Sequence, residues 1–89
     1  MIDFDECLEV GKKVKRHQKR IISKLKNGKL VTGVWLITNP TNEANLYDIF
    51  DAKLLIFSYY KKMNIHVYGI AKTKDEAIEL LLGVLEKRI

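Results

Sequence analysis

The chain has 89 residues, of which 47% are hydrophobic, and it carries a formal net charge of +5. This length supports one hydrophobic core, so we expect a single domain over residues 1–89 whose small core would benefit from self-association. No apolar run approaches the ~18 residues of a membrane span. Residues 1–6 lack a signal peptide's basic and apolar regions, and Cys7, the single cysteine, cannot form an internal disulfide. We therefore expect a cytoplasmic globular protein.

The first twenty-six residues fit two interpretations. Asp3 and Glu6 could open a helix, and we favour a short N-terminal helix followed by a hairpin strand. Alternatively, residues 3–26 form one helix, because Leu8, Val14, Ile21 and Leu25 approximate helical spacing, and Gly28 caps its C-terminal end.

The dipeptide Asn27-Gly28 favours the hairpin, because both residues readily adopt the positive φ values of a type I′ turn. The turn would pair residues 18–26 with residues 29–37. The run from Leu30 to Thr38 is rich in β-branched residues and contains Trp35, as is typical of a strand, and an Asn-Pro dipeptide follows it. Further along, the pattern predicts a short strand near 46–50 and a helix near 52–60.

The last third of the chain gives the clearest pattern. Residues 64–71 predict a strand whose small apolar side chains lie beneath the following helix; these are Ile65, Val67, Gly69 and Ala71. Thr73 and Glu76 have the spacing of a capping box, which predicts a helix over 74–88. Its apolar arc covers roughly 200°, about twice the ~100° of a one-sided surface helix, which indicates deep burial or contact with a partner subunit.

Together these elements predict a small α+β domain. An antiparallel or mixed sheet, built from the Asn27-Gly28 hairpin and strand 64–71, is expected to pack against helix 74–88.

Patterns that carry catalysis or bind metals are nearly absent. Cys7, His17 and His66 are the candidates for nucleophilic or soft-metal chemistry, and their separations of 10 and 49 positions match no zinc-ligand spacing. Asp48 and Asp51 could share a helix face, but their surroundings resemble a solvated surface. The glycines form no phosphate-binding loop. We predict no enzyme, no catalytic or metal-ligating residue and no cofactor.

The charges are strongly segregated along the chain. No acidic residue occurs between Val10 and Asn42, and nine of the sixteen basic residues lie within this interval. They are Lys12, Lys13, Lys15, Arg16, Lys19, Arg20, Lys24, Lys26 and Lys29. In a hairpin, Trp35 would lie near Arg20 and could stack on a base, whereas a helix would give a basic ridge. Either geometry predicts binding of nucleic acid through its phosphate backbone.

Aromatic residues support a different hypothesis. Trp35, Tyr59, Tyr60 and Tyr68 could anchor a protein interface, because aromatic side chains combine contact area with a polar tip. Together with the wide apolar arc of the last helix, they indicate a homodimer, or a small inhibitor or adaptor that docks on an acidic surface of a larger protein. Phosphate binding should collapse with salt, whereas an aromatic-anchored interface should persist.

Overall fold

The computed structural model describes residues 2–40 and 46–87, except for the side chains of residues 58, 59 and 87. Four strands form one mixed sheet in the order β1-β4-β2-β3, with β1 parallel to β4 and β2 antiparallel to both β3 and β4. The strands are β1 (Ile2–Val10), β2 (Trp35–Thr38), β3 (Asp48–Asp51) and β4 (Ile65–Ala71). The helices are η1 (Lys15–His17), α1 (Gln18–Lys26), η2 (Ala52–Ile56), α2 (Ser58–Lys61) and α3 (Lys74–Lys87), where η marks a 3₁₀ helix. The predicted α+β class is confirmed.

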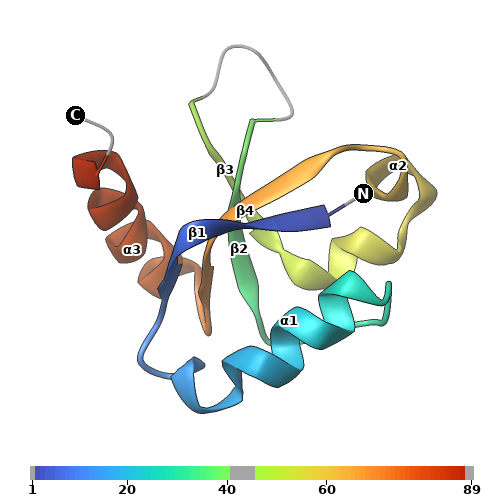
Figure 1. Ribbon diagram of the computed structural model, residues 1–89, viewed down its shortest axis with the longest axis horizontal. Coiled ribbons are helices and arrows are strands. Elements are labelled where there is room, and N and C mark those ends of the chain that lie inside the picture. Colours follow the sequence, from blue (N-terminus) through green and yellow to red (C-terminus); the bar gives the residue numbers. More distant parts are fainter. Residues whose placement is uncertain (1, 41–45, 88–89) are drawn as a thin grey trace.

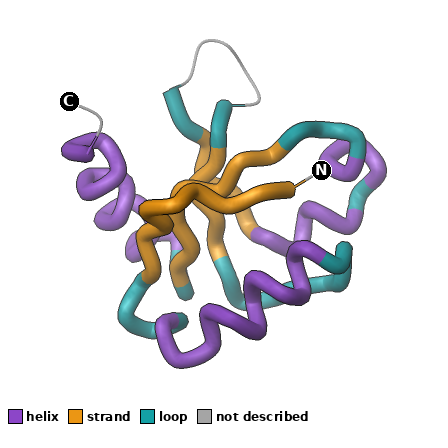
Figure 2. The backbone as a smooth tube through the Cα atoms, viewed as in Figure 1, coloured by secondary structure: helices purple, strands orange, loops and turns teal. Residues whose placement is uncertain are grey.

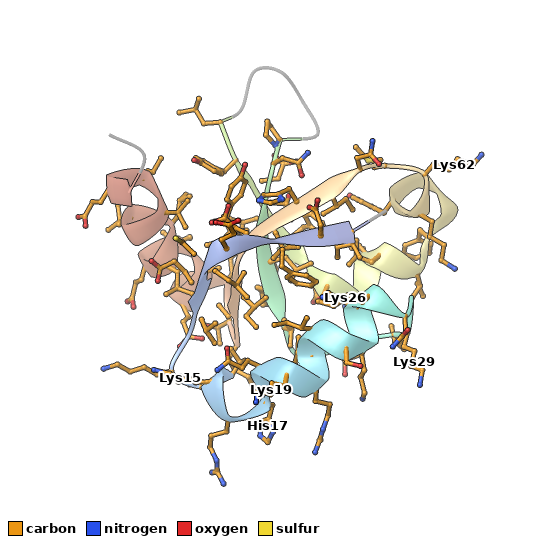
Figure 3. All side chains as sticks on the ribbon, in the orientation of Figure 1. Lys15, His17, Lys19, Lys26, Lys29 and Lys62 are labelled. Atoms are coloured by element: carbon orange, nitrogen blue, oxygen red, sulfur yellow. The ribbon has the colours of Figure 1, made fainter. Side chains whose placement is uncertain are left out.

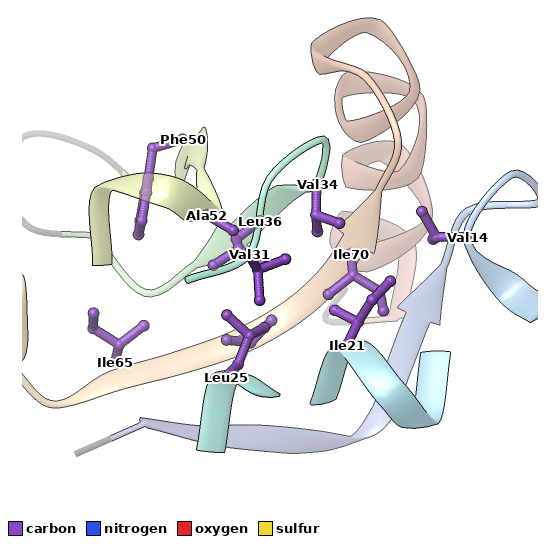
Figure 4. Packing of buried hydrophobic residues seen from close by; sticks show 11 residues of the cluster. Val14, Ile21, Leu25, Val31, Val34, Leu36, Phe50, Ala52, Ile65 and Ile70 are labelled. Atoms are coloured by element: carbon purple, nitrogen blue, oxygen red, sulfur yellow. The ribbon is translucent and has the colours of Figure 1, made fainter. Parts of the chain in front are cut away.

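Helices cover both faces of the sheet, as Figures 1 and 2 show. On one face, α1 and η2 enclose the larger apolar cluster, in which Leu36 and Ile70 are fully buried (Figure 4). On the other face, Ala77 and Val84 of α3 pack against Ile37 and Ala71. The sheet is thus the middle of three layers, and α1 and α3 lie on opposite sides of it.

The predicted N-terminal helix is wrong, because residues 2–10 form the edge strand β1. Ile2, Phe4, Leu8 and Val10 alternate along this strand and pack against the larger cluster. The ladder with β4 is interrupted between Phe4 and Glu9, where the edge strand bulges. An interrupted edge that carries several acids is a poor template for pairing with another chain.

The predicted Asn27-Gly28 hairpin is also wrong, because residues 18–26 form α1 and Gly28 follows its C-terminal end. Asn27 has a φ of −92°, whereas a type I′ turn requires positive φ at both central residues. Gly28, at φ +70°, donates to the Leu25 carbonyl, and Lys29 donates to the Lys24 carbonyl. These two bonds form a Schellman cap, which agrees with the alternative that Gly28 ends a helix.

The strand expected over Leu30–Thr38 is shorter than predicted, since β2 begins at Trp35 and a loop with Gly33 at φ +71° precedes it. The short strand and helix expected near 46–50 and 52–60 correspond to β3 and to η2 with α2.

Strand β4 matches the expected residues but not the expected face. Ile65 and Val67 point toward α1 and η2, whereas Tyr68 and Ala71 belong to the cluster under α3. The cause is an irregularity at Tyr68, since Ile37 pairs with Gly69 while the neighbouring Thr38 pairs with Val67. One extra residue reverses the alternation of side chains along a strand.

The helix predicted over 74–88 is confirmed as α3 (Lys74–Lys87), and so is its N-terminal cap; residue 88 lies outside the described residues. The Glu76 N–H donates to Thr73 Oγ1 (3.1 Å), and Glu76 Oε1 accepts from the Lys72 N–H (2.7 Å). The apolar arc is wider than the contact it makes, because Ile78 and Leu82 remain 47% and 62% exposed.

Candidate functional site

All nine basic residues of the acid-free segment have exposed side chains, and we call them together the basic surface. Lys12 and Lys13 lie in the turn after β1, the next six lie on η1 and α1, and Lys29 follows the helix. None of the nine forms an ion pair with another described residue, and the segment that carries them contains no acidic residue. In Figure 3, Lys15, Lys19 and Lys29 lie along the α1 edge, away from the C-terminal end of α3.

Burial of a few apolar residues fixes this arrangement. Val14, Ile21 and Leu25 are 3%, 7% and 4% exposed and face the larger cluster. Ile21 and Leu25 are one helical turn apart, so they hold one face of α1 against the sheet. The basic residues between Val14 and Leu25 therefore point outward.

Some of the basic residues are placed where they destabilise their own helix. The first turn of α1 contains Lys19 and Arg20, no acidic residue and no side-chain cap. Cations at the positive end of a helix dipole are unfavourable by about 0.3–1 kcal/mol each. Arg20 and Lys24 are also four residues apart, where like charges repel by about 0.2–0.5 kcal/mol. A bound anion would relieve both penalties.

Several of these cations converge on one cavity, which we call the α1–loop cavity. It has a volume of about 210 Å³ and lies between α1 and the loop 30–34. Lys13, His17, Arg20 and Lys24 line it from one side, and Lys72 lines it from the end of β4. No acidic residue is among the described residues that line it. The cavity can therefore hold an anion such as a phosphate, with Arg20 able to donate two parallel hydrogen bonds.

Lys72 is a member of this site that the sequence analysis missed. It is 48 positions from Lys24 and joins the cavity because Ala71 pairs with Trp35 at the start of β2. The pairing of β2 with β4 brings the end of β4 beside the loop 30–34, which precedes β2. The position of Lys72 directly after the predicted strand 64–71 was the available signal. Placing Lys72 beside the loop 30–34 also required knowledge that β4 pairs with β2.

Two of the predicted interface aromatics, Trp35 and Tyr68, lie on the opposite face of the sheet from α1. Trp35 packs in the α3-side cluster, so the expected proximity of Trp35 and Arg20 is wrong. Tyr68 contacts both Tyr47 and His66, with ring centroids 5.1 and 4.7 Å apart. Tyr60 stacks on Phe50, and the side chain of Tyr59 lies outside the described residues.

A small group of acids surrounds His66 on β4. Its Nδ1 is 2.7 Å from Asp3 Oδ1, and its Nε2 is 3.0 Å from Asp5 Oδ1. The hydrogen bond with Asp5 raises the pKa of His66 above 6.5, Asp3 adds to this, and partial burial opposes it. Cys7 is exposed, and the described residues contain no group of three or more side chains suited to hold a metal ion. The two contacts between His66 of β4 and the acids of β1 clamp these strands together.

Comparison of the chain with models of protein families, with curated proteins and with solved structures gives no significant match in any of the three. Among the described residues, no helix has both the length and the apolar character that crossing a membrane requires.

Proposed function

We propose that this protein binds nucleic acid without catalysis, through the phosphate backbone and the basic surface. The observation that carries the proposal is that nine exposed cations, none of them in an ion pair with another described residue, follow one another along a single segment. Two of them, Lys19 and Arg20, lie in the first turn of α1, where cations destabilise the helix. Selection for stability or solubility alone would place acids at the start of α1, as it does at the start of α3. A ligand with many negative charges gives this arrangement a purpose.

The dimensions of the segment fit a nucleic-acid backbone. Together, η1 and α1 contain 12 residues, which span about 20 Å. Measured along the axis of a duplex, roughly six phosphates of one strand occupy that length, at ~3.4 Å per nucleotide. The α1–loop cavity offers a fixed position for one of them, between Arg20 and Lys72. Contacts of this kind hold the backbone in place and carry no base specificity.

Fluorescence anisotropy with labelled single-stranded DNA, duplex DNA and RNA tests the proposal across a salt series. We expect binding in the micromolar range or tighter, and log affinity that falls linearly with log salt, with a slope of about −0.9 per phosphate contacted on a duplex. A variant with Lys15→Glu, Arg16→Glu, Lys19→Glu and Arg20→Glu should not bind. Absence of binding by the wild type to all three ligands at low salt would refute the proposal.

A matched control separates location from net charge. Lys62→Glu/Lys74→Glu and Arg20→Glu/Lys24→Glu each lower the net charge by four, and all four side chains are exposed. We expect the second pair to weaken binding about 100-fold and the first pair to weaken it a few-fold. Equal losses would show that overall charge, rather than the basic surface, determines affinity.

A second candidate function is protein binding through α3. The observation that favours it is the exposed apolar side of this helix. Ile78 and Leu82 are exposed and one turn apart, so they can contact a second copy or a larger acidic protein. Sedimentation at high salt tests the homodimer: association there that is lost in Ile78→Ser/Leu82→Ser supports the interface. A nucleic-acid ligand and a sequence with a single cysteine, Cys7, are both consistent with a cytoplasmic location.

A further inference from the structure

A second cavity, of about 390 Å³, lies at the C-terminal end of α1, and we call it the α1–α2 cavity. Its walls come from α1, from the η2–α2 segment and from the first residues of β1 and β4. The apolar part of its lining consists of Ile2, Leu25, Leu55, Met63 and Ile65, with Tyr60 beside them. Its volume lies near the lower end of the ~300–1,000 Å³ range of small-molecule sites, which suits a group of nucleoside size.

Three exposed lysines line the same cavity. Lys26 and Lys29 belong to the basic surface, and Lys61 comes from α2. No acidic residue is among the described residues that line it. The carbonyls of the last turn of α1, which would repel an anion, accept hydrogen bonds from Gly28 and Lys29. The cavity therefore combines an apolar interior with a positive rim, which fits a group that is apolar in the middle and anionic at its edges.

We infer that this cavity takes one unpaired base of single-stranded nucleic acid, with the phosphates on either side of that base on Lys26, Lys29 and Lys61. The inference rests on the proposed function and names its preferred ligand. Two of the three rim lysines belong to the basic surface, so a backbone that follows α1 reaches the mouth of the cavity without a break. A base has apolar faces for the interior, and its neighbouring phosphates match the charge of the rim.

Tyr60 prepares the cavity for a flat ring. Its ring stacks on Phe50, with centroids 5.1 Å apart and an interplanar angle of 29°, so its orientation is fixed before a ligand arrives. Asn27 lines the cavity with its amide Nδ2 bonded to the Ser23 carbonyl (2.8 Å), which provides a held polar group near the rim. Insertion of a base from a duplex requires unstacking and unpairing, which cost a few kcal/mol. The geometry thus favours single strands over duplexes.

The experiment compares single-stranded and duplex forms of one DNA sequence that carries a fluorescent adenine analogue. We expect the single strand to bind at least about tenfold more tightly at the same salt concentration, and the fluorescence of the analogue to change on binding. Met63→Trp fills the cavity, so it should remove the preference and the fluorescence change while leaving duplex binding within about twofold. Ile78→Trp, on the exposed side of α3, is the matched control and should change neither.

A surface variant tests the inference without disturbing the packing. Lys61 lines the cavity, whereas its neighbour Lys62 does not, and both side chains are exposed. Lys61→Glu should reduce single-strand affinity more than duplex affinity, and Lys62→Glu should affect both forms equally. Thermal unfolding of each variant checks that it is folded.

The outcomes separate this inference from the proposed function. Equal affinity for single strand and duplex, or a preference that survives both Met63→Trp and Lys61→Glu, overturns the base-binding cavity and leaves the basic surface as a backbone site. Binding to neither form overturns the proposed function and the inference together.

Discussion

The helices α1 and α3 pack against opposite faces of one sheet, yet their first turns are opposite in charge. The second and third residues of α3 are Asp75 and Glu76, and at the same positions α1 has Lys19 and Arg20. Thr73 caps α3 through the Glu76 N–H, whereas α1 has no side-chain cap. The first-turn charges of α3 follow the helix dipole, and those of α1 oppose it.

This difference indicates that the surface charges of the two helices meet different requirements. An N-terminal cap and favourable first-turn charges add to the packing of α3, whereas the first turn of α1 has neither and α1 depends more on its buried contacts. A helix held by packing can carry charges that a self-stabilised helix would exclude. The comparison therefore identifies α1 as the helix whose first-turn charges do not stabilise it.

The largest expected effect tests the dependence of α1 on packing. Leu25→Ala should lower the free energy of unfolding by about 2–5 kcal/mol, because Leu25 is 4% exposed in the larger cluster. Leu82→Ala, on the 62% exposed side of α3, should change it by less than about 0.5 kcal/mol. Urea denaturation of both variants measures the contrast. Similar losses would mean that α3 also uses its outer side, as a dimer interface would require.

Exchange of the first-turn charges tests the comparison directly. Lys19→Asp/Arg20→Glu should raise the free energy of unfolding by about 1 kcal/mol at low salt, because two unfavourable charges become favourable. The same change should weaken nucleic-acid binding by at least about tenfold. Thermal unfolding and anisotropy on one sample measure both effects. A variant that loses stability as well as affinity would show that the cations of α1 are structural.

Glycine substitutions give opposite signs in the two helices. Gly28→Ala should cost about 1 kcal/mol, because Gly28 caps α1 at φ +70° and a Cβ is unfavourable there. Gly83→Ala in α3 should raise the free energy of unfolding by about 0.5–1 kcal/mol, because alanine loses less backbone freedom than glycine in a helix. A Cβ there would lie 3.4 Å from Glu9 Oε1, which is an ordinary contact. Chemical denaturation of each variant reports the sign. A stabilising Gly28→Ala would contradict the Schellman cap.

The sequence predicted α3 and β4 because their signals are local. A capping box, acids in the first turn and a run of alternating residues can be recognised within a window of about fifteen positions. The alternation of Ile2, Phe4, Leu8 and Val10 was an equally local signal for β1, but the acids between them resembled a helix start. The extra residue at Tyr68 had no such signal, and it changed which side chains face α3.

The dipeptide Asn27-Gly28 shows the limit of a local motif. It suits a type I′ turn and a helix cap equally, and the choice depends on whether Ile21 and Leu25 can be buried together. The basic surface was predictable because exposure of nine cations follows in either geometry. The two cavities were not, since Lys72 and Lys61 join them through strand order and the packing of α2.

The smallest expected effect is on the pH dependence of stability. It extends the comparison to the sheet face under α3, where His66 is paired with Asp3 and Asp5. Since Asp5 and Asp3 raise the pKa of His66 in the folded protein, the protonated ring stabilises the fold. That contribution is fully present below the unfolded pKa of about 6.5 and is lost as the pH rises through the higher folded value. Asp5→Asn should therefore lower the pKa of His66 and flatten the pH dependence of thermal stability, whereas Glu6→Gln, an exposed neighbour, should do neither. NMR titration of the His66 ring measures the first effect, and unchanged titration in Asp5→Asn would show that the clamp between β1 and β4 does not persist in solution.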